Sequence, residues 1–313
     1  MSVSVGFVIV SHQAGGQLLR LTQRLAAEYD NPPIVCHHDF GQAPLDTSAF
    51  GDRVRFVRPH VATSWGKLSV VHAVLSAIDL LYEDKGPDWF FHLSAQDYPA
   101  MRGSRVREEL FETDCDAFMD IRSLHLPDEA AATLVSEDNP ATAFNSSESN
   151  RALKRRFYLS RQWWLPIVRF RPRLRMGRIT FRPKREAKTP YGPDFRCFYG
   201  DFWFAGNRRV GEILANRTDL HLRLQDHLRG RTFPEESYFQ TILANETGLR
   251  ICRDNRRFAI WEGGSHPQIL AEQDTGAILS SGAFFARKFK EGTSVLDRID
   301  EALNGQPALT SHG

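Results

Sequence analysis

Cysteine is scarce in this sequence, and its placement argues against two common kinds of site. The 313 residues include only Cys36, Cys115, Cys197 and Cys252, and no two of them form a C-x-x-C pair. Zinc sites and small disulfide scaffolds need cysteines that cluster at regular spacings. Neither is therefore indicated, and reduced thiols are expected.

Long hydrophobic runs are also missing. No segment reaches the roughly 18 uninterrupted apolar residues that a membrane span needs. The N-terminal stretch MSVSVGFVIVSHQAGG has neither the charged start nor the long apolar part of a secretory leader. Because 42% of the residues are nonetheless hydrophobic, the composition predicts a globular protein with a substantial core, located in the cytoplasm.

Several familiar nucleotide and hydrolase motifs are absent. There is no Walker A loop, and Gly15-Gly16 does not complete a G-x-G-x-x-G fingerprint. Neither H-E-x-x-H nor G-x-S-x-G occurs. Nucleotide hydrolysis and NAD chemistry therefore lose their usual support.

What the sequence does contain is an alternation of strand-like and helix-like segments. The hydrophobic patterns predict strands at 3–10, 33–40, 54–57, 117–120 and within 88–100, and helices at 18–29 and 65–82. After an irregular stretch, a strand, turn and helix follow at 196–215, a helix begins at Pro234-Glu235, and a last helix covers 295–303. This alternation predicts an α/β fold with a mainly parallel central sheet flanked by helices. In such sheets ligands bind at the carboxyl ends of the strands.

Positive charge is concentrated in one segment. Residues 151–190 hold 14 Lys and Arg residues against a single acid, Glu186, although the whole chain has a formal net charge of only +2. Arginine is interleaved there with Phe157, Tyr158, Trp163, Trp164, Phe170 and Phe181. Such a pattern is typical of nucleic-acid binding or of anchoring to anionic lipid, and equally of a solvated insertion. One hypothesis for the function is therefore a nucleic-acid or membrane-surface binding protein. A related hypothesis is an enzyme attached through this segment to the inner face of a membrane.

Polar residues gather just after the predicted strands and at one helix start. They are Val10-Ser-His12, Asp39, Thr63-Ser-Trp65, Gln96-Asp97, Asp201-Phe-Trp203, Glu235-Glu236, Ser265-His266 and Arg287-Lys288. Taken singly, each has a structural explanation. Pro234 and the two glutamates suit the first turn of a helix, where a missing N–H costs nothing and acids favour the positive end of the dipole. Helical spacing does not distinguish Glu235 from Glu236, because both have apolar neighbours along the helix.

As an ordered series, these stretches resemble a known enzyme family. TSWGKLSVV, DWFFHLSAQDYP, WFAGNRRV, FPEESYFQTIL, NRRFAIW and GAFFARKF are similar to the glycosyltransferase family that contains peptide O-xylosyltransferase and the core-2/I-branching β-1,6-N-acetylglucosaminyltransferases. The similarity runs from Val5 to about Phe289 and is greatest on the xylosyltransferase side, whereas residues 121–190 match nothing we can place. The family's cysteine cluster, membrane anchor and stem are missing, as expected of a cytosolic, bacterial-type member.

The resemblance implies a fold, a reaction and a domain organisation. We expect one GT-A-like domain over 1–313, with 151–190 as a basic insertion and 304–313 as a tail. The family transfers a sugar from a UDP-sugar to a hydroxyl with inversion and without a divalent metal, so we expect no cofactor. One base and one cationic cluster suffice for that single displacement. The only D-x-D sequence, Asp114-Cys-Asp116, is interpreted as structural rather than as a metal site.

The resemblance also assigns roles to individual residues. The family's catalytic base aligns with Glu236, which leaves Glu235 as a capping or supporting acid. Arg287 and Lys288 align with diphosphate ligands, a role that suits the fork of an arginine beside a lysine. Ser265 aligns with a further diphosphate contact, although a one-residue shift selects His266.

The nucleotide and the donor sugar fall on other stretches. Val10 and Asp39 align with uridine contacts, and Thr63, Ser64 and Trp65 with the donor pocket. Near Trp203 the family's sugar-contacting acid aligns with either Asp201 or Phe202. The donor sugar is expected to be xylose or N-acetylglucosamine, and the acceptor a hydroxyl of a glycan, a lipid-linked glycan or a protein.

Overall fold

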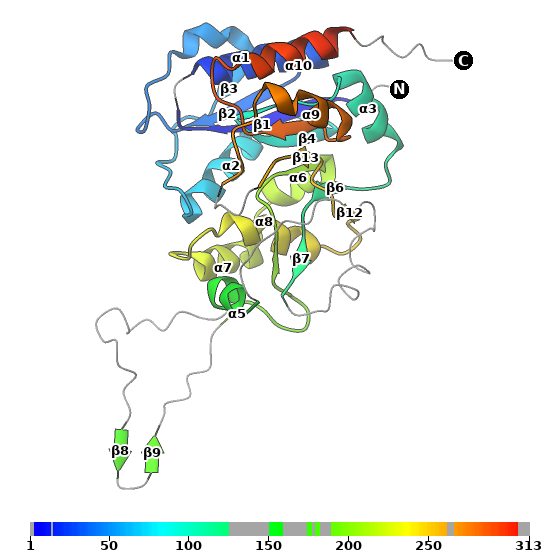
Figure 1. Ribbon diagram of the computed structural model, residues 1–313. Coiled ribbons are helices and arrows are strands. Elements are labelled where there is room, and N and C mark those ends of the chain that lie inside the picture. The colour runs from blue at the N-terminus through cyan, green and yellow to red at the C-terminus, as the bar shows by residue number, and fades with distance from the viewer. Residues whose placement is uncertain are drawn as a thin grey trace.

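The computed structural model describes residues 3–13, 15–124, 150–158, 174–176, 179–181, 189–261 and 266–305 (Figure 1). The first half contains β1 (Val5–Ser11), α1 (Gly16–Tyr29), β2 (Ile34–His38), the 3-10 helix η1 (Thr47–Arg53), β3 (Val54–Phe56), α2 (Leu68–Leu81), β4 (Trp89–Ser94), β5 (Asp97–Pro99), α3 (Gly103–Glu112), β6 (Ala117–Met119) and β7 (Arg122–Ser123).

The second half begins with α5 (Asn150–Leu153) and the π-helical turn η2 (Lys154–Tyr158). It continues with β8 (Leu174–Met176), β9 (Ile179–Phe181), β10 (Phe198–Tyr199), β11 (Phe204–Asn207), α6 (Arg208–Ala215), α7 (Asp219–Leu228), α8 (Glu235–Ala244), β12 (Ile251–Cys252), β13 (Arg257–Phe258), the 3-10 helix η3 (Glu272–Asp274), α9 (Thr275–Ser280), β14 (Phe285–Arg287) and α10 (Ser294–Gly305).

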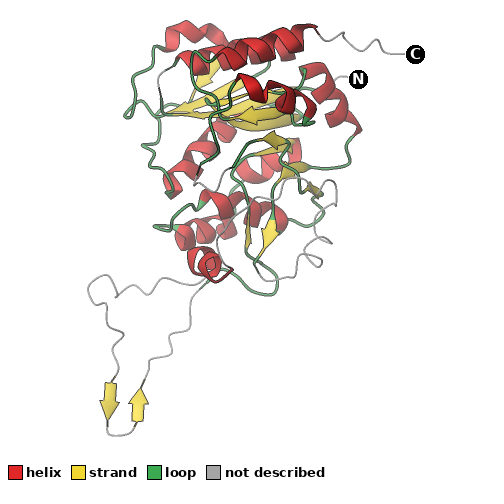
Figure 2. Ribbon diagram, viewed as in Figure 1, coloured by secondary structure: helices red, strands yellow, loops and turns green. Residues whose placement is uncertain are grey.

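A seven-stranded sheet forms the centre of the molecule, in the order β12-β6-β11-β4-β1-β2-β3 (Figure 2). Strands β1 to β4 run parallel to one another, and β12 runs parallel to β6. Only β11 is antiparallel to its neighbours. The predicted α/β fold with a mainly parallel sheet is therefore confirmed.

Helices cover both faces of this sheet. Successive side chains of a strand point to opposite faces, and β1 shows the result: Phe7 and Ile9 pack with α1 and α10, whereas Val8 packs with α2 and α8. Figure 1 shows α1 and α10 over one face and α2, α6 and α8 over the other. The helices cover the faces of the sheet, so the ends of the strands remain available for polar residues.

A smaller sheet extends the carboxyl end of β4. Its strand order is β13-β14-β5, and Arg287 of β14 lies directly opposite Asp97 of β5. Because β5 follows β4 after two residues, this sheet places the residues of β14 beside the carboxyl end of the central strands.

Two expectations from the sequence need correction. The helix expected over 65–82 begins at Leu68, since Trp65 and Gly66 form a turn before it. More importantly, Cys115 and Cys252 form a disulfide across 137 residues, so the prediction of reduced thiols is wrong for this pair. Cys36 and Cys197 are free and buried, as expected.

The basic segment 151–190 is only partly described. Trp163, Trp164 and Phe170 lie outside the described residues. Phe157 is fully buried and Tyr158 stacks on Tyr191, with ring centroids 5.3 Å apart. These two rings are therefore packed against the protein rather than presented to a nucleic acid or a membrane. None of the helices in the described ranges is long and apolar enough to cross a membrane.

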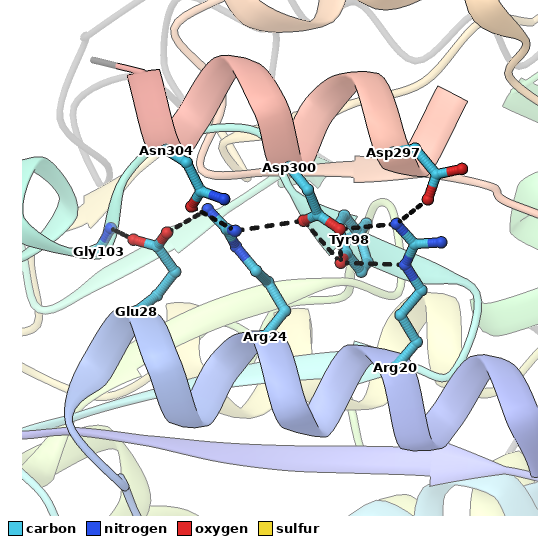
Figure 3. Close-up of polar contacts among 8 residues, drawn as sticks. All are labelled: Arg20, Arg24, Glu28, Tyr98, Gly103, Asp297, Asp300 and Asn304. Carbon is cyan, nitrogen blue, oxygen red and sulfur yellow. Dashed lines mark hydrogen bonds and ion pairs between the residues drawn. The ribbon is translucent and has the colours of Figure 1, made fainter. Parts of the chain in front are cut away.

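Helix α10 is held to α1 by a row of ion pairs (Figure 3). Asp300 is the centre of this row: it lies 2.6 Å from Arg20 and 3.3 Å from Arg24, and it accepts a hydrogen bond of 2.9 Å from the hydroxyl of Tyr98. Asp297 has only Arg20, at 2.7 Å, and its side chain is 66% exposed against 26% for Asp300. Asp300 is thus the acid that joins α1, α10 and β5.

We expect Asp300→Ala to lower the free energy of unfolding by about 1–2 kcal/mol, because it leaves two arginines and a buried tyrosine hydroxyl without a shared acceptor. The matched variant Asp297→Ala should cost less than about 1 kcal/mol, as exposed ion pairs do. Urea denaturation of both variants measures the difference. Equal losses of stability in the two variants would show that Asp300 contributes no more than Asp297.

Candidate functional site

A cavity of about 350 Å³ opens at the carboxyl ends of β1, β2 and β4. It is lined by Val10, Ser11, His12, Gln13, His37, Gln42, Thr63, Trp65, Val70, Ala73, Ser94, Ala95, Gln96, Phe202, Trp203, Glu235, His266, Pro267, Arg287 and Lys288. This position is where an α/β sheet is expected to bind its ligand.

The cavity gathers most of the residues selected from the sequence. Those that line it directly are Val10, Thr63, Trp65, Trp203, Arg287 and Lys288. Asp39, Ser64, Asp201 and Glu236 are not among its lining residues, and Ser265 lies outside the described residues. Segments more than 270 residues apart in the chain, at β1 and β14, therefore meet at one site.

Asp39 supports the cavity wall without lining it. Its buried carboxylate accepts hydrogen bonds from the backbone and side chain of Thr63, at 2.6 and 2.7 Å, and from the amide of Gln42, at 2.8 Å. Burial alone would raise the pKa of Asp39, but these bonds, together with one from the backbone of Gly41, hold it well below its usual range. Asp39 is therefore a fixed anion that positions two lining residues.

An aromatic group forms one edge of the cavity. The exposed ring of Trp65 lies 4.5 Å from that of Phe233 and 5.3 Å from that of His266. Gly66, with φ at +64°, makes the turn that a side chain would strain, and its carbonyl accepts a hydrogen bond from Phe233 N–H. This turn brings Trp65 next to the start of α8.

The cationic part of the cavity depends on a buried carboxylate. Asp97 is fully buried, and its Oδ1 lies 3.3 Å from Arg257 Nη1 and 3.7 Å from Arg287 Nε. The Arg287 guanidinium also lies 4.0 Å from the ring centre of Trp203. Within the described ranges no hydrogen bond occupies the Nη groups of Arg287, so its fork is available to a ligand in the cavity.

Asp201 lies behind Trp203 rather than on the cavity wall. Its Oδ2 accepts a hydrogen bond of 2.8 Å from Asn255. Burial raises the pKa of Asp201 to about 6, against the opposing effect of the nearby Arg287. The adjacent Gly200 allows a close approach, because a Cβ there would lie 1.9 Å from the carbonyl oxygen of Asp120. Of the two residues aligned with the family's sugar-contacting acid, the one that lines the cavity is Phe202.

Glu236 is paired with a residue from the start of the basic segment. Its Oε2 accepts a hydrogen bond of 3.0 Å from Arg156 Nη1. The Arg156 guanidinium lies 5.1 Å from the ring centre of Phe233, and its carbonyl accepts from Arg231. Segment 150–158 is therefore attached to α7 and α8 beside the cavity.

The environment of Glu235 differs from that of Glu236. It lines the cavity, is 6% exposed, and its Oε2 has no hydrogen-bond partner in the described part of the chain. Burial raises the pKa of Glu235 to about 7, although a hydrogen bond to its own backbone and the charge of Arg156 act against the shift.

The D-x-D sequence has structural partners. Asp116 accepts hydrogen bonds from the side chain of Asn207, at 2.7 Å, and from Arg250 N–H, at 2.8 Å, while Asp114 lies 3.1 Å from the Arg250 guanidinium. These contacts join β6, β11 and β12 and support the structural interpretation. Among the described residues, no group of three or more His, Cys, Asp or Glu side chains is placed to hold a metal ion.

Four polar lining residues were not selected from the sequence: Gln13, His37, Gln42 and Ser94. The Nε2 of His37 accepts a hydrogen bond from Val61 N–H at 2.9 Å. The available signal for Gln42 was its place three residues after Asp39, in the turn that follows a strand.

Comparison with known proteins points to glycosyltransferases. No protein-family model matches the chain. The β-glucuronosyltransferase GlcAT14B of Arabidopsis thaliana is 25% identical over 329 residues, which cover 99% of this chain and 67% of the plant protein. Xylosyltransferase 1 of Rattus norvegicus is 25% identical over 339 residues, covering 98% of this chain and 36% of the rat protein. This chain therefore spans about two thirds of the first relative and about a third of the second.

Among solved structures, the galactosyltransferase LgtC aligns over 97% of this chain and 98% of its own, with 9% identity and a TM-score of 0.37. That likeness is too distant to support an argument. The sequence relatives are glycosyltransferases, and they support sugar transfer as the activity.

The pKa of Glu235 predicts a pH-dependent stability. The folded value near 7 exceeds the ordinary value of 4.5, so between these pH values the folded state keeps a proton that the unfolded state has lost. Stability attributable to Glu235 therefore falls as the pH rises through this window. Glu235→Gln should consequently be more stable than the parent by about 2–3 kcal/mol at pH 8 and nearly equal to it at pH 4. Urea denaturation from pH 4 to 8 measures this; parallel stability curves would contradict it.

Proposed function

We propose that this protein is an inverting, metal-independent glycosyltransferase with a GT-A-like domain, which moves a sugar from a UDP-sugar to an acceptor hydroxyl. The observation that carries the proposal is the composition of one cavity: Arg287 and Lys288 line it together with the acidic start of α8. The sequence relatives are glycosyltransferases, which supports the same function.

The nucleotide lies along the first strands in this proposal. The uridine occupies the end formed by Val10, Thr63 and Gln42, and Asp39 fixes the last two from below. The diphosphate meets Arg287 and Lys288. An arginine whose Nε side faces Asp97 can offer its Nη fork to phosphate oxygens, and a lysine adds a mobile charge.

The reaction is a single displacement. The acceptor oxygen attacks the anomeric carbon while the bond from that carbon to the diphosphate oxygen breaks. Glu236 takes the proton of the acceptor hydroxyl, and the two cations stabilise the charge that develops on the departing UDP. Arg156 donates a hydrogen bond of 3.0 Å to Glu236 and so fixes the position of its carboxylate.

Three donors deserve direct comparison. The family resemblance favours UDP-xylose and UDP-N-acetylglucosamine, and the plant relatives add UDP-glucuronic acid. The acceptor is a hydroxyl of a glycan, a lipid-linked glycan or a protein.

We expect Arg287→Ala to weaken UDP binding about 10- to 100-fold, because charge-assisted hydrogen bonds contribute about 1.5–3 kcal/mol. Isothermal titration with UDP measures the change. Arg298→Ala is the control, since Arg298 sits on the exposed face of α10 and pairs only with Glu272 and Glu301 in the described chain. Unchanged affinity in Arg287→Ala would remove the diphosphate from this part of the cavity.

Glu236→Gln should lower turnover by about 10²–10⁴-fold while leaving UDP affinity within about twofold, because a general base acts on the acceptor and not on the nucleotide. Release of UDP from a sugar nucleotide in the presence of acceptor measures turnover. Turnover within about tenfold of the parent would reject Glu236 as the base.

A further inference from the structure

Glu235 is the one acid on the cavity wall that the proposed reaction does not use. A single displacement needs one proton acceptor, and that role belongs to Glu236. Yet the cavity-lining acid of the pair is Glu235, which is 94% buried and has an oxygen without a hydrogen-bond partner. Buried polar groups in folded proteins are nearly always hydrogen-bonded, so a carboxyl with an unpartnered oxygen on a residue that lines a cavity points to a ligand group that completes it.

The other groups on the cavity wall indicate which part of the ligand Glu235 meets. The cavity has its cations at Arg287 and Lys288, and Trp203 lies against Arg287. The group attached to the diphosphate of a nucleotide sugar is the sugar itself, whose surface is covered with hydroxyls. Phe202 and Trp203 supply the apolar part of the wall near Arg287, and Glu235 supplies a hydrogen-bonding group.

We propose that Glu235 is a specificity-determining residue, whose carboxyl forms a hydrogen bond with a hydroxyl of a neutral sugar on the nucleotide donor. This inference rests on the proposed function. A carboxyl with a pKa near 7 can donate as well as accept a hydrogen bond at neutral pH, and both suit a hydroxyl. In its ionised form, the same acid repels the carboxylate of a uronic acid in a cavity of low dielectric. The inference therefore favours a neutral sugar over glucuronic acid.

Other charges around Glu235 bear on this choice. Arg156 acts on it from segment 150–158, and Arg287, Lys288, His12, His37 and His266 line the same cavity. The two cations of β14 and its end are engaged by the diphosphate when a donor is bound. Once a donor is bound, Glu235 is therefore the acidic residue of the cavity wall that distinguishes a sugar hydroxyl from a sugar carboxylate.

Titration of the full chain with UDP, UDP-xylose, UDP-N-acetylglucosamine and UDP-glucuronic acid tests the inference. In the parent, one neutral-sugar donor should bind at least about 10-fold more tightly than UDP, and UDP-glucuronic acid should not. Glu235→Ala should lose that advantage while its affinity for UDP stays within about twofold. Glu235→Gln, which keeps a donor and an acceptor, should retain most of it.

The contrary outcomes are distinct. Tightest binding of UDP-glucuronic acid by the parent, or an unchanged sugar advantage in Glu235→Ala, overturns the inference. Equal weakening of UDP and UDP-sugar in both variants shows a structural role and overturns it too. If turnover collapses in Glu235→Gln with donor binding intact, Glu235 is the proton acceptor instead. Failure of UDP itself to bind the parent rejects the proposed function. Glu246→Gln, just beyond α8, is the control for loss of a negative charge.

Discussion

The attraction between one buried carboxylate and two arginines determines how this site is built. Asp97 lies at the start of β5, is fully buried, and faces both Arg257 and Arg287. Two guanidinium groups this close would repel each other without an anion, and a buried charge needs a partner to remain ionised. Asp97 thereby holds Arg287 on the cavity wall, where its guanidinium lies 4.0 Å from the ring centre of Trp203. The small sheet β13-β14-β5 holds these three residues together.

The remaining parts of the site follow from the topology of the large sheet. Parallel strands β1, β2 and β4 end at the same edge, so Val10, Asp39 and Ser94 come together although they are far apart in sequence. Helix α8 begins at that edge and presents two adjacent acids in different surroundings. Glu236 has an ion pair with Arg156, whereas Glu235 is buried and lines the cavity. One local sequence thus supplies an ion-paired carboxyl and a buried one, of which one oxygen has no hydrogen-bond partner in the described ranges.

Much of this arrangement could be predicted from the sequence, for reasons of periodicity. Alternating strands and amphipathic helices up to residue 120 predicted the sheet, and the family resemblance predicted Thr63, Trp65 and Trp203 as residues of the donor site. The separate surroundings of Glu235 and Glu236 could not be predicted, because adjacent positions at a helix start share the same apolar spacing. The Cys115–Cys252 disulfide could not be predicted either, because Cys115 precedes β6 and Cys252 lies in the neighbouring strand β12, 137 residues further along the chain.

The central claim is that the cavity binds a nucleotide diphosphate through fixed cations and without a bound metal. The most direct measurement is the thermal stability of the full chain in EDTA as UDP is added. Binding to the folded state raises the unfolding midpoint by mass action, so the account predicts a saturable increase that is the same with and without EDTA. A midpoint that stays constant at millimolar UDP, or one that rises only when a divalent metal is supplied, would contradict it.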